Sequence, residues 1–180
     1  MKIKKKNDRS KNRIYRISLL ILICVLLTAV FAGCGKRDVE ATGAQTASCT
    51  ISITCDAILA DMESFNPDKK DFVPEDGVIL SETVVAINNG DTVYDILRKA
   101  CRDNNILMES RNTTGMVYVE GIAQLYEFDG GELSGWMYRV NGVFPEYGSA
   151  SVKANDGDHI EWLYTMKLGT DIGDEHDPES

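Results

Sequence analysis

The chain has 180 residues and a formal net charge of −9, and 43% of its residues are hydrophobic and 26% charged. These proportions are typical of a folded globular protein and exclude a disordered chain, a collagen-like chain and a membrane protein with many spans. Residues 1–33 carry +7, so the other 147 residues carry −16, and a domain this acidic lacks the basic surface that phosphate backbones require, which excludes nucleic acid as a partner.

The first 33 residues have the pattern of an export signal. A basic stretch precedes an uncharged apolar run over residues 17–33, which is typical of a secretory signal peptide. Ala32, Gly33 and Cys34 then resemble the lipobox of bacterial lipoproteins, in which the cysteine is lipidated and becomes the mature N-terminus. We therefore expect export, lipidation of Cys34 and anchoring at the outer face of the bacterial cell membrane. The alternatives are an uncleaved N-terminal anchor and a plain thiol at Cys34.

Both ends of the remaining chain are poor in large apolar residues. Residues 34–48 are rich in Ala, Thr, Ser and Gly, so we expect a flexible spacer. Residues 170–180 are acidic, and we expect a frayed tail there. Calcium binding by the tail aspartates is an alternative, although their spacing is not that of a calcium loop. A single folded domain over residues 49–169 is left between them.

The body of the chain predicts short strands around one helix. Residues 50–55 alternate polar and apolar side chains, and residues 83–87 form a β-branched run that ends at a turn-forming Asn-Asn-Gly cluster. Thr92 and Asp95 have the spacing of a capping box at the start of a helix. Residues 117–119 begin another extended segment. The apolar positions at helical spacing, expected to form the buried stripe of the helix, are Val93, Ile96, Leu97, Ala100 and Cys101.

The clearest local signal is the Asn-Gly pair at 141–142, which lies between two apolar runs and predicts a β-hairpin with a type I′ turn. A two-residue loop would set Val140 opposite Val143 and Tyr138 opposite Pro145. The residues expected on one face of this hairpin are Trp136, Tyr138, Val140, Val143, Pro145 and Tyr147.

A last strand is expected over residues 160–165, with Ile160, Trp162 and Tyr164 on one side. Several short strands, a single helix and no regular alternation of strands with helices predict a small β-rich α+β domain.

Three cysteines of the body would face an oxidising compartment after export, since Cys24 lies in the signal. Cys49 and Cys55 lie on one predicted strand about 20 Å apart, which is too far for a disulfide. A disulfide would therefore join Cys101 to one of them, and we favour Cys55 because it comes last in its strand. Three buried thiols are the alternative. No fourth ligand is available for a zinc site.

The sequence contains no recognisable catalytic set. The GxSxG, HExxH, P-loop and GxGxxG patterns are all missing. Ser149 lies in the most nucleophile-like context, but the sequence places no base beside it, and His159 lies among acidic residues. The many carboxylates are more typical of a solvated surface than of a hydrolase. We therefore expect a binding protein without catalytic residues, metal or cofactor.

Aromatic residues are concentrated in the C-terminal half of the chain. A hydrophobic core is one interpretation, and we favour it for Trp162 and Tyr164. A binding platform is the other, and it suits the hairpin face, where Trp136, Tyr138 and Tyr147 would lie together. Gly148 beside them would let a ligand or a partner backbone approach closely.

Three stretches resemble the C-terminal domain of transcobalamin and intrinsic factor, and they resemble more closely the bacterial lipoproteins that share this domain. These stretches are residues 90–97 (GDTVYDIL), 134–142 (SGWMYRVNG) and 156–162 (DGDHIEW). The resemblance covers residues 49–169. It implies a β-grasp-like fold and a module that binds a soluble ligand, with Trp136 as the matching contact.

Two functional hypotheses follow. The first is a lipid-anchored surface module that holds a small amphiphilic ligand, such as the corrinoid cobalamin, against Trp136, Tyr138, Tyr147 and Gly148. The second is an adhesion or envelope-assembly domain whose hairpin binds a surface protein.

Overall fold

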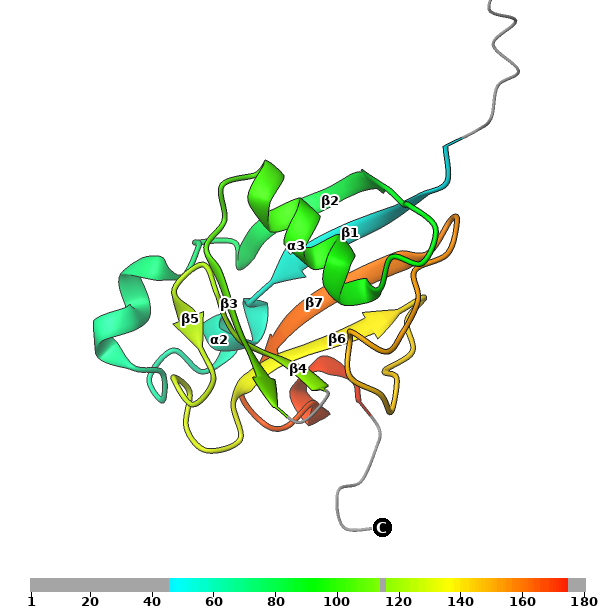
Figure 1. The fold of residues 1–180 in the computed structure, drawn as a ribbon. Helices are drawn as coiled ribbons and strands as arrows, with labels where there is room; N and C mark the ends of the chain where they lie inside the picture. Colours follow the sequence, from blue (N-terminus) through cyan, green and yellow to red (C-terminus); the bar gives the residue numbers. More distant parts are fainter. Residues whose placement is uncertain (1–45, 114–115, 175–180) are drawn as a thin grey trace, which may run out of the picture. The chain divides into compact units, whose positions relative to one another are not determined.

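The structure, a computed structural model, describes residues 46–113 and 116–174 (Figure 1). The predicted signal peptide, the lipidation site at Cys34, nearly all of the predicted spacer and the last residues of the tail lie outside the described residues. Within the described part, no helix has both the length and the apolar character needed to cross a membrane.

Four strands form the larger sheet, in the order β2-β1-β7-β6. β1 runs parallel to β7 at the centre, and the outer strands β2 and β6 run antiparallel to their neighbours. Helix α3 (Val93–Asp103) lies across one face of this sheet (Figure 1). This strand order with one crossing helix is that of a β-grasp fold, which confirms the predicted α+β class. The strand bounds are Ser48–Thr54 for β1, Val78–Ala86 for β2, Gly135–Val140 for β6 and His159–Thr165 for β7.

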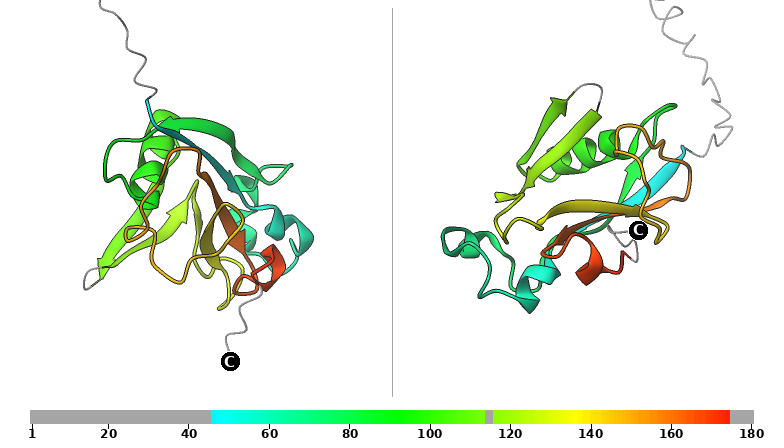
Figure 2. Two further views of the ribbon diagram at one scale, coloured as in Figure 1. Left: turned by 90° about the vertical axis from the view of Figure 1, so that its right-hand side faces the viewer. Right: turned by 90° about the horizontal axis from the view of Figure 1, so that it is seen from below.

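A smaller sheet has the order β3-β4-β5, and its β3–β4 hairpin stands on the same side of the larger sheet as α3 (Figure 2). β4 confirms the extended segment predicted at residues 117–119. The sequence does not predict β3 or β5, because β3 is a polar stretch without alternation and β5 has two residues. The bounds are Met108–Thr113 for β3, Met116–Ile122 for β4 and Leu125–Tyr126 for β5.

Short helical segments accompany the sheets, and the expectation of a single helix is wrong in this respect. They are α2 (Asp56–Ala60) and the 3₁₀ helices η2 (Pro67–Phe72) and η3 (Thr170–Ile172). α2 has five residues, too few to show a helical period in the sequence. η3 falls within the expected frayed tail. It is held because the Asp171 carboxylate accepts hydrogen bonds from the Thr165 hydroxyl and from the Met166 N–H.

Helix α3 begins with the predicted capping box. The Thr92 hydroxyl accepts the Asp95 N–H at 3.2 Å, and the Asp95 carboxylate accepts the Thr92 N–H at 3.0 Å. The helix ends at Asp103, and Asn104 is its C-cap. All five residues of the predicted apolar stripe are buried, so the local pattern and the tertiary packing agree.

Replacing Thr92 with Ala should lower the free energy of unfolding by about 1 kcal/mol, because the first turn of α3 loses its side-chain acceptor. Thr92→Ser keeps the hydroxyl and should retain most of that stability. Urea denaturation of both variants checks this, and an unchanged midpoint for Thr92→Ala would contradict the capping role.

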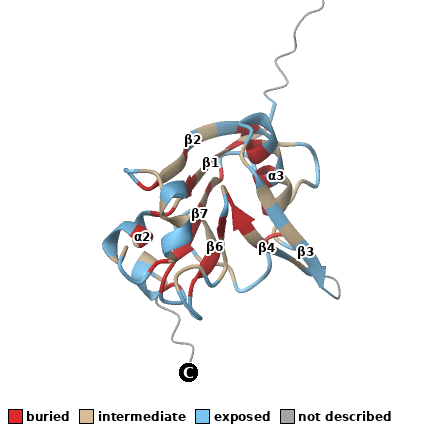
Figure 3. Ribbon diagram, turned by 90° about the vertical axis from the view of Figure 1, so that its left-hand side faces the viewer, coloured by how far each residue is buried: buried red, intermediate tan, exposed pale blue. Residues whose placement is uncertain are grey.

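The core lies between α3 and one face of the larger sheet. Ile51 and Ile53 of β1 and Ile160, Trp162 and Tyr164 of β7 are buried on this face. Figure 3 shows buried residues along β7, β4 and the inner side of α3. The predicted orientation of the side chains on both strands is confirmed. Trp162 and Tyr164 are core residues, which is the interpretation that we favoured for them.

The predicted type I′ turn is confirmed. Asn141 and Gly142 have φ values of 54° and 80°, and a type I′ turn requires a positive φ at both central residues. Val140 and Val143 exchange two backbone hydrogen bonds, of 2.9 and 3.0 Å.

The prediction of a second hairpin strand after the turn is wrong. Residues 144–149 turn away from β6 after that one pair, and β6 pairs with β7 instead. The next hydrogen-bonded pair of the hairpin would have been Tyr138 with Pro145. Proline has no N–H to donate to a ladder, so Pro145 ends the pairing, and the face predicted for this hairpin does not form as a unit.

Candidate functional site

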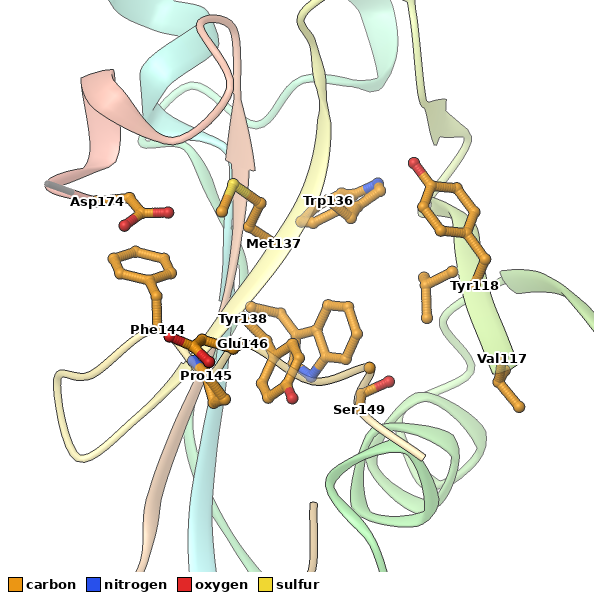
Figure 4. Close-up of a pocket in the computed structure, with 13 residues that line it drawn as sticks. Val117, Tyr118, Trp136, Met137, Tyr138, Phe144, Pro145, Glu146, Ser149 and Asp174 are labelled. Carbon is orange, nitrogen blue, oxygen red and sulfur yellow. The ribbon is translucent and has the colours of Figure 1, made fainter. Parts of the chain in front are cut away.

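A cavity of about 310 Å³ opens beside the edge strand β6 (Figure 4). Its walls come from β4 at residues 117–119, from β6 at residues 136–138 and from the segment that follows the type I′ turn. Trp136 and Tyr138 point to one side of β6, whereas Met137 between them points to the other. All three line the cavity, which therefore wraps around the outer edge of the sheet.

Trp136 joins this cavity to the core. It is 7% exposed, and its ring packs edge-on against Tyr164 with the ring centres 5.3 Å apart. Its indole N–H donates to the Leu125 carbonyl at 2.8 Å. Most of the side chain is therefore core, and one part of the ring forms cavity wall.

Tyr138 is half-buried and stacks on Trp162, with the ring centres 5.3 Å apart and an angle of 29° between the planes. Its hydroxyl donates to the Tyr147 carbonyl at 2.6 Å, which fixes the segment after the turn to the Tyr138 side chain. Burial raises the pKa of Tyr138 to about 12, so the phenol is neutral and remains a donor at physiological pH.

The structure brings three of the four predicted binding residues to the cavity. Trp136, Tyr138 and Gly148 line it, but Tyr147 does not. The Tyr147 side chain is 69% exposed, because the segment that carries it leaves β6 at Pro145 instead of continuing the hairpin. The Tyr147 ring therefore lies outside this cavity, and its role in binding stays a prediction.

Other residues of the cavity are not predicted by the sequence. Tyr118 comes from β4, and burial together with a hydrogen bond to Glu127 raises its pKa to about 12. Phe144 and Ser149 come from the segment after the turn. No local pattern indicates that β4 lies beside β6, since that contact depends on how the two sheets pack.

Two residues of the cavity wall bring polar side-chain groups to it, Trp162 and Ser149. Among the described residues, the Trp162 indole N–H is the one side-chain N or O atom that is fully buried without a hydrogen bond. A buried donor without an acceptor is unfavourable by about 1–3 kcal/mol. A ligand acceptor would remove this penalty once the rings that cover the Trp162 N–H move enough to expose it.

The charged residues of the wall are both acidic. Glu146 and Asp174 line the cavity, and no basic side chain from the described part of the chain does. Across the described residues, no three His, Cys, Asp or Glu side chains come together as a metal site.

On the opposite face, β6 is tied to β7 by an ion pair. Arg139 donates to the Glu161 carboxylate with two nitrogens, at 2.6 and 2.7 Å. These hydrogen bonds from Arg139 hold the pKa of Glu161 below its usual value of 4.5. A lowered carboxyl pKa stabilises the fold above the unfolded-state pKa, and this stabilisation disappears as the pH falls through the folded-state value.

Replacing Glu161 with Gln should therefore lower the free energy of unfolding at pH 7. The difference from the parent protein should shrink as the pH falls below about 4.5. Denaturation at a series of pH values measures it. Glu132→Gln on an exposed residue is the control, and an equal pH dependence in both variants would contradict the role of the ion pair.

The three body cysteines are free, buried thiols. The expected disulfide between Cys55 and Cys101 is not formed among the described residues. The structure instead has three buried thiols, which was the alternative. Cys55 leaves the strand direction, with φ −136° and ψ 29°, to begin α2. Burial raises the pKa to about 11 for Cys49 and to about 12 for Cys55 and Cys101.

These thiols should not react with iodoacetamide at pH 8 in the folded protein, because both access and thiolate formation are suppressed. All three should react after unfolding without a reductant. Mass spectrometry of the alkylated peptides assigns each residue, and a pair that reacts only after reduction would show a disulfide.

The fold and the cavity thus define a small β-grasp-like domain with an aromatic cavity at one sheet edge. Residues 90–166 match the family described as Domain of unknown function (DUF4430), and this segment contains every lining residue except Asp174. Comparison with the curated proteins finds no match.

Two solved structures are similar to this chain. One is haptocorrin in complex with Cbi, at 15% identity and a TM-score of 0.44, over 68% of this chain and 26% of that chain. The other is a candidate metal-binding protein from Ruminococcus gnavus ATCC 29149, at 12% identity and a TM-score of 0.40, over 66% of this chain and 96% of that chain. The chain thus spans about a quarter of the haptocorrin chain, as the 26% coverage shows.

Proposed function

We propose that the protein is an exported, lipid-anchored binding module that holds an amphiphilic ligand in the β6 cavity without converting it chemically. The observation that carries this proposal is an aromatic cavity wall that also holds two polar side-chain groups, the Trp162 indole N–H, which is buried without a partner among the described residues, and the Ser149 hydroxyl. Apolar walls with a few well-placed polar groups are typical of ligand sites. Anchoring rests on the signal pattern and on the cysteine at position 34.

The cavity wall offers aromatic rings for apolar contact and polar groups for hydrogen bonds. Tyr138 and Phe144 offer apolar ring surface, and the indole N–H of Trp162 and the hydroxyl of Ser149 offer hydrogen bonds. A ligand with a flat apolar part and a carbonyl or amide oxygen complements both. We infer binding without chemical conversion, because the sequence contains no recognisable catalytic set.

A corrinoid is the first ligand to test, because the sequence resembles the transcobalamin C-terminal domain. The cavity of about 310 Å³ is at the lower end of the ~300–1,000 Å³ of ligand pockets. It would therefore hold an edge of a corrin ring and leave the rest outside.

The test is a titration of the full chain, in a mild detergent, with cobalamin and related corrinoids. The two tryptophans of the chain both line the cavity, so quenching of their fluorescence reports binding directly. N-acetyltryptophanamide, titrated in parallel, corrects for absorption of light by the corrinoid.

Tyr138→Leu should weaken saturable quenching at least tenfold, whereas Tyr147→Ala, outside the cavity, should leave it unchanged. Absence of saturable quenching in folded protein would remove corrinoids from the proposal. Saturable quenching that Tyr138→Leu does not alter would place the ligand elsewhere.

A further inference from the structure

The outer edge of β6 is open over part of its length. The Asn141 N–H donates to the His159 carbonyl of β7, whereas the Val140 N–H donates outward to Val143. Backbone groups alternate sides along an antiparallel strand. The N–H and C=O of Tyr138 and Trp136 therefore point outward, away from β7, and no backbone group of the described residues pairs with them.

The sequence keeps this edge open. The chain turns back at residues 141–142 and would cover Tyr138 with its next hydrogen-bonded pair, but Pro145 occupies that position. Because proline has no N–H, the returning chain diverges and becomes one wall of the cavity. An open strand edge is a template for another strand, and here it lies at the base of an aromatic cavity.

The shape of the site selects a single extended chain. β4 stands on one side of the open edge, and the segment after the turn stands on the other (Figure 4). Because walls stand on both sides of this edge, we infer that a single extended strand reaches it more readily than the edge strand of a second folded copy. The cavity then receives one side chain of that strand.

We propose that the β6 edge binds an extended peptide by strand addition, with backbone hydrogen bonds to Tyr138 and one large apolar side chain in the cavity. Strand addition takes its affinity from the main chain and its specificity from pockets for alternate side chains. This proposal specifies how the hairpin region could bind a protein partner, which was the second hypothesis from the sequence. It rests on the proposed function, because both use the same cavity as the binding site.

Charge defines the peptide further. Both charged residues of the wall, Glu146 and Asp174, are acidic, and the chain beyond residue 33 carries −16. Such a surface attracts cations and repels acidic segments. The partner is therefore an extended segment with basic residues beside its apolar anchor.

The experiment uses the full chain and nine-residue peptides of alternating Thr and Val with Lys at both ends. The central residue is varied among Phe, Tyr, Trp, Leu and Ile, and binding is measured by calorimetry. At least one member should bind, and replacing its Lys residues with Glu should weaken binding at least threefold. No binding by any member at 1 mM would overturn the proposal.

Backbone pairing is separated from simple filling of the cavity by N-methylation. Methyl groups on alternate peptide nitrogens remove the donors along one edge of the strand and leave the other edge intact. One methylation pattern should weaken binding at least about tenfold, because strand hydrogen bonds are lost, and the complementary pattern should bind almost as well as the parent. Equal effects of the two patterns would overturn strand addition.

The Tyr138 amide supplies a second readout. Peptide addition should slow its hydrogen exchange at least tenfold in NMR spectra, whereas the Met137 and Arg139 amides, which already face β7, should not change. Corrinoid binding without peptide binding would refute this inference alone. Failure of both ligands in folded protein would refute the proposed function as well.

Discussion

Trp136→Ala should lower the free energy of unfolding by about 3–5 kcal/mol, as expected for the loss of a large buried aromatic side chain. The ring contact with Tyr164 disappears, a void opens where the two sheets meet, and the Leu125 carbonyl loses the indole N–H. Small domains have a total stability of about 5–15 kcal/mol, so this one change removes a large share. Chemical denaturation followed by circular dichroism measures it, because the signal does not depend on the removed tryptophan.

Two variants make the Trp136 result specific. Trp136→Phe keeps most of the ring contact but loses the hydrogen bond, and it should be destabilised less than Trp136→Ala. Tyr147→Ala, on a residue that is 69% exposed, should change stability by less than about 0.5 kcal/mol. A loss below about 1 kcal/mol for Trp136→Ala would contradict its place in the core. Since this variant weakens the fold, Tyr138 rather than Trp136 is the residue to change in binding experiments.

Gly77→Ala should destabilise the fold nearly as much, lowering the free energy of unfolding by about 2–5 kcal/mol. Gly77 has φ +71°, and a Cβ atom there would lie 2.7 Å from the backbone Cα of Asp56. A left-handed conformation is unfavourable for alanine by about 1–2 kcal/mol, and the collision with backbone adds about 1–3 kcal/mol. The Gly77 carbonyl also accepts the Cys55 N–H at 2.7 Å, so a shift here would disturb the end of β1.

Gly157→Ala is the matched control, because Gly157 has φ +81° and no atom lies within 4 Å of an added Cβ. Gly157→Ala should lower the free energy of unfolding by about 1–2 kcal/mol, which is the cost of the left-handed backbone conformation alone. Thermal and urea denaturation of both variants give the difference. Equal losses for the two variants would show that the contact with Asp56 has no influence on stability.

The parts of the fold that the sequence predicts correctly have a regular local pattern. Helix α3 combines a capping box with a complete apolar stripe, and β1 and β7 alternate over most of their length. Strand β3 has no such pattern, because it is polar and lies in a small sheet with little buried surface. Its position depends on contacts with distant residues, which periodicity does not report.

The hairpin shows how one residue overrides a strong local signal. Asn141 and Gly142 form the predicted turn, yet the pairing stops after Val140 and Val143. Pro145 was visible in the sequence, and its missing N–H is the physical reason. Counting backbone donors along the second arm therefore corrects the hairpin prediction without a structure.

The candidate site was predictable in part. Trp136, Tyr138 and Gly148 were predicted because the hairpin signal and the family resemblance both pointed to them. Tyr118 and Ser149 carry no local signal of a binding role, since they reach the cavity through the packing of β4 and of the segment after the turn. Sites assembled from several elements are found by sequence patterns only where those elements carry their own signals.

The parallel pair of β1 and β7 has a consequence for how the protein is made. Ile51 lies beside Ile160 and Ile53 beside Trp162, so the centre of the sheet joins the first and the last strand of the domain. Contacts between residues so distant in the chain form slowly, because a long loop must close first. The central sheet therefore cannot be completed before β7 has been synthesised, and under the proposed export this delay would keep the domain incomplete until nearly all of the chain has emerged.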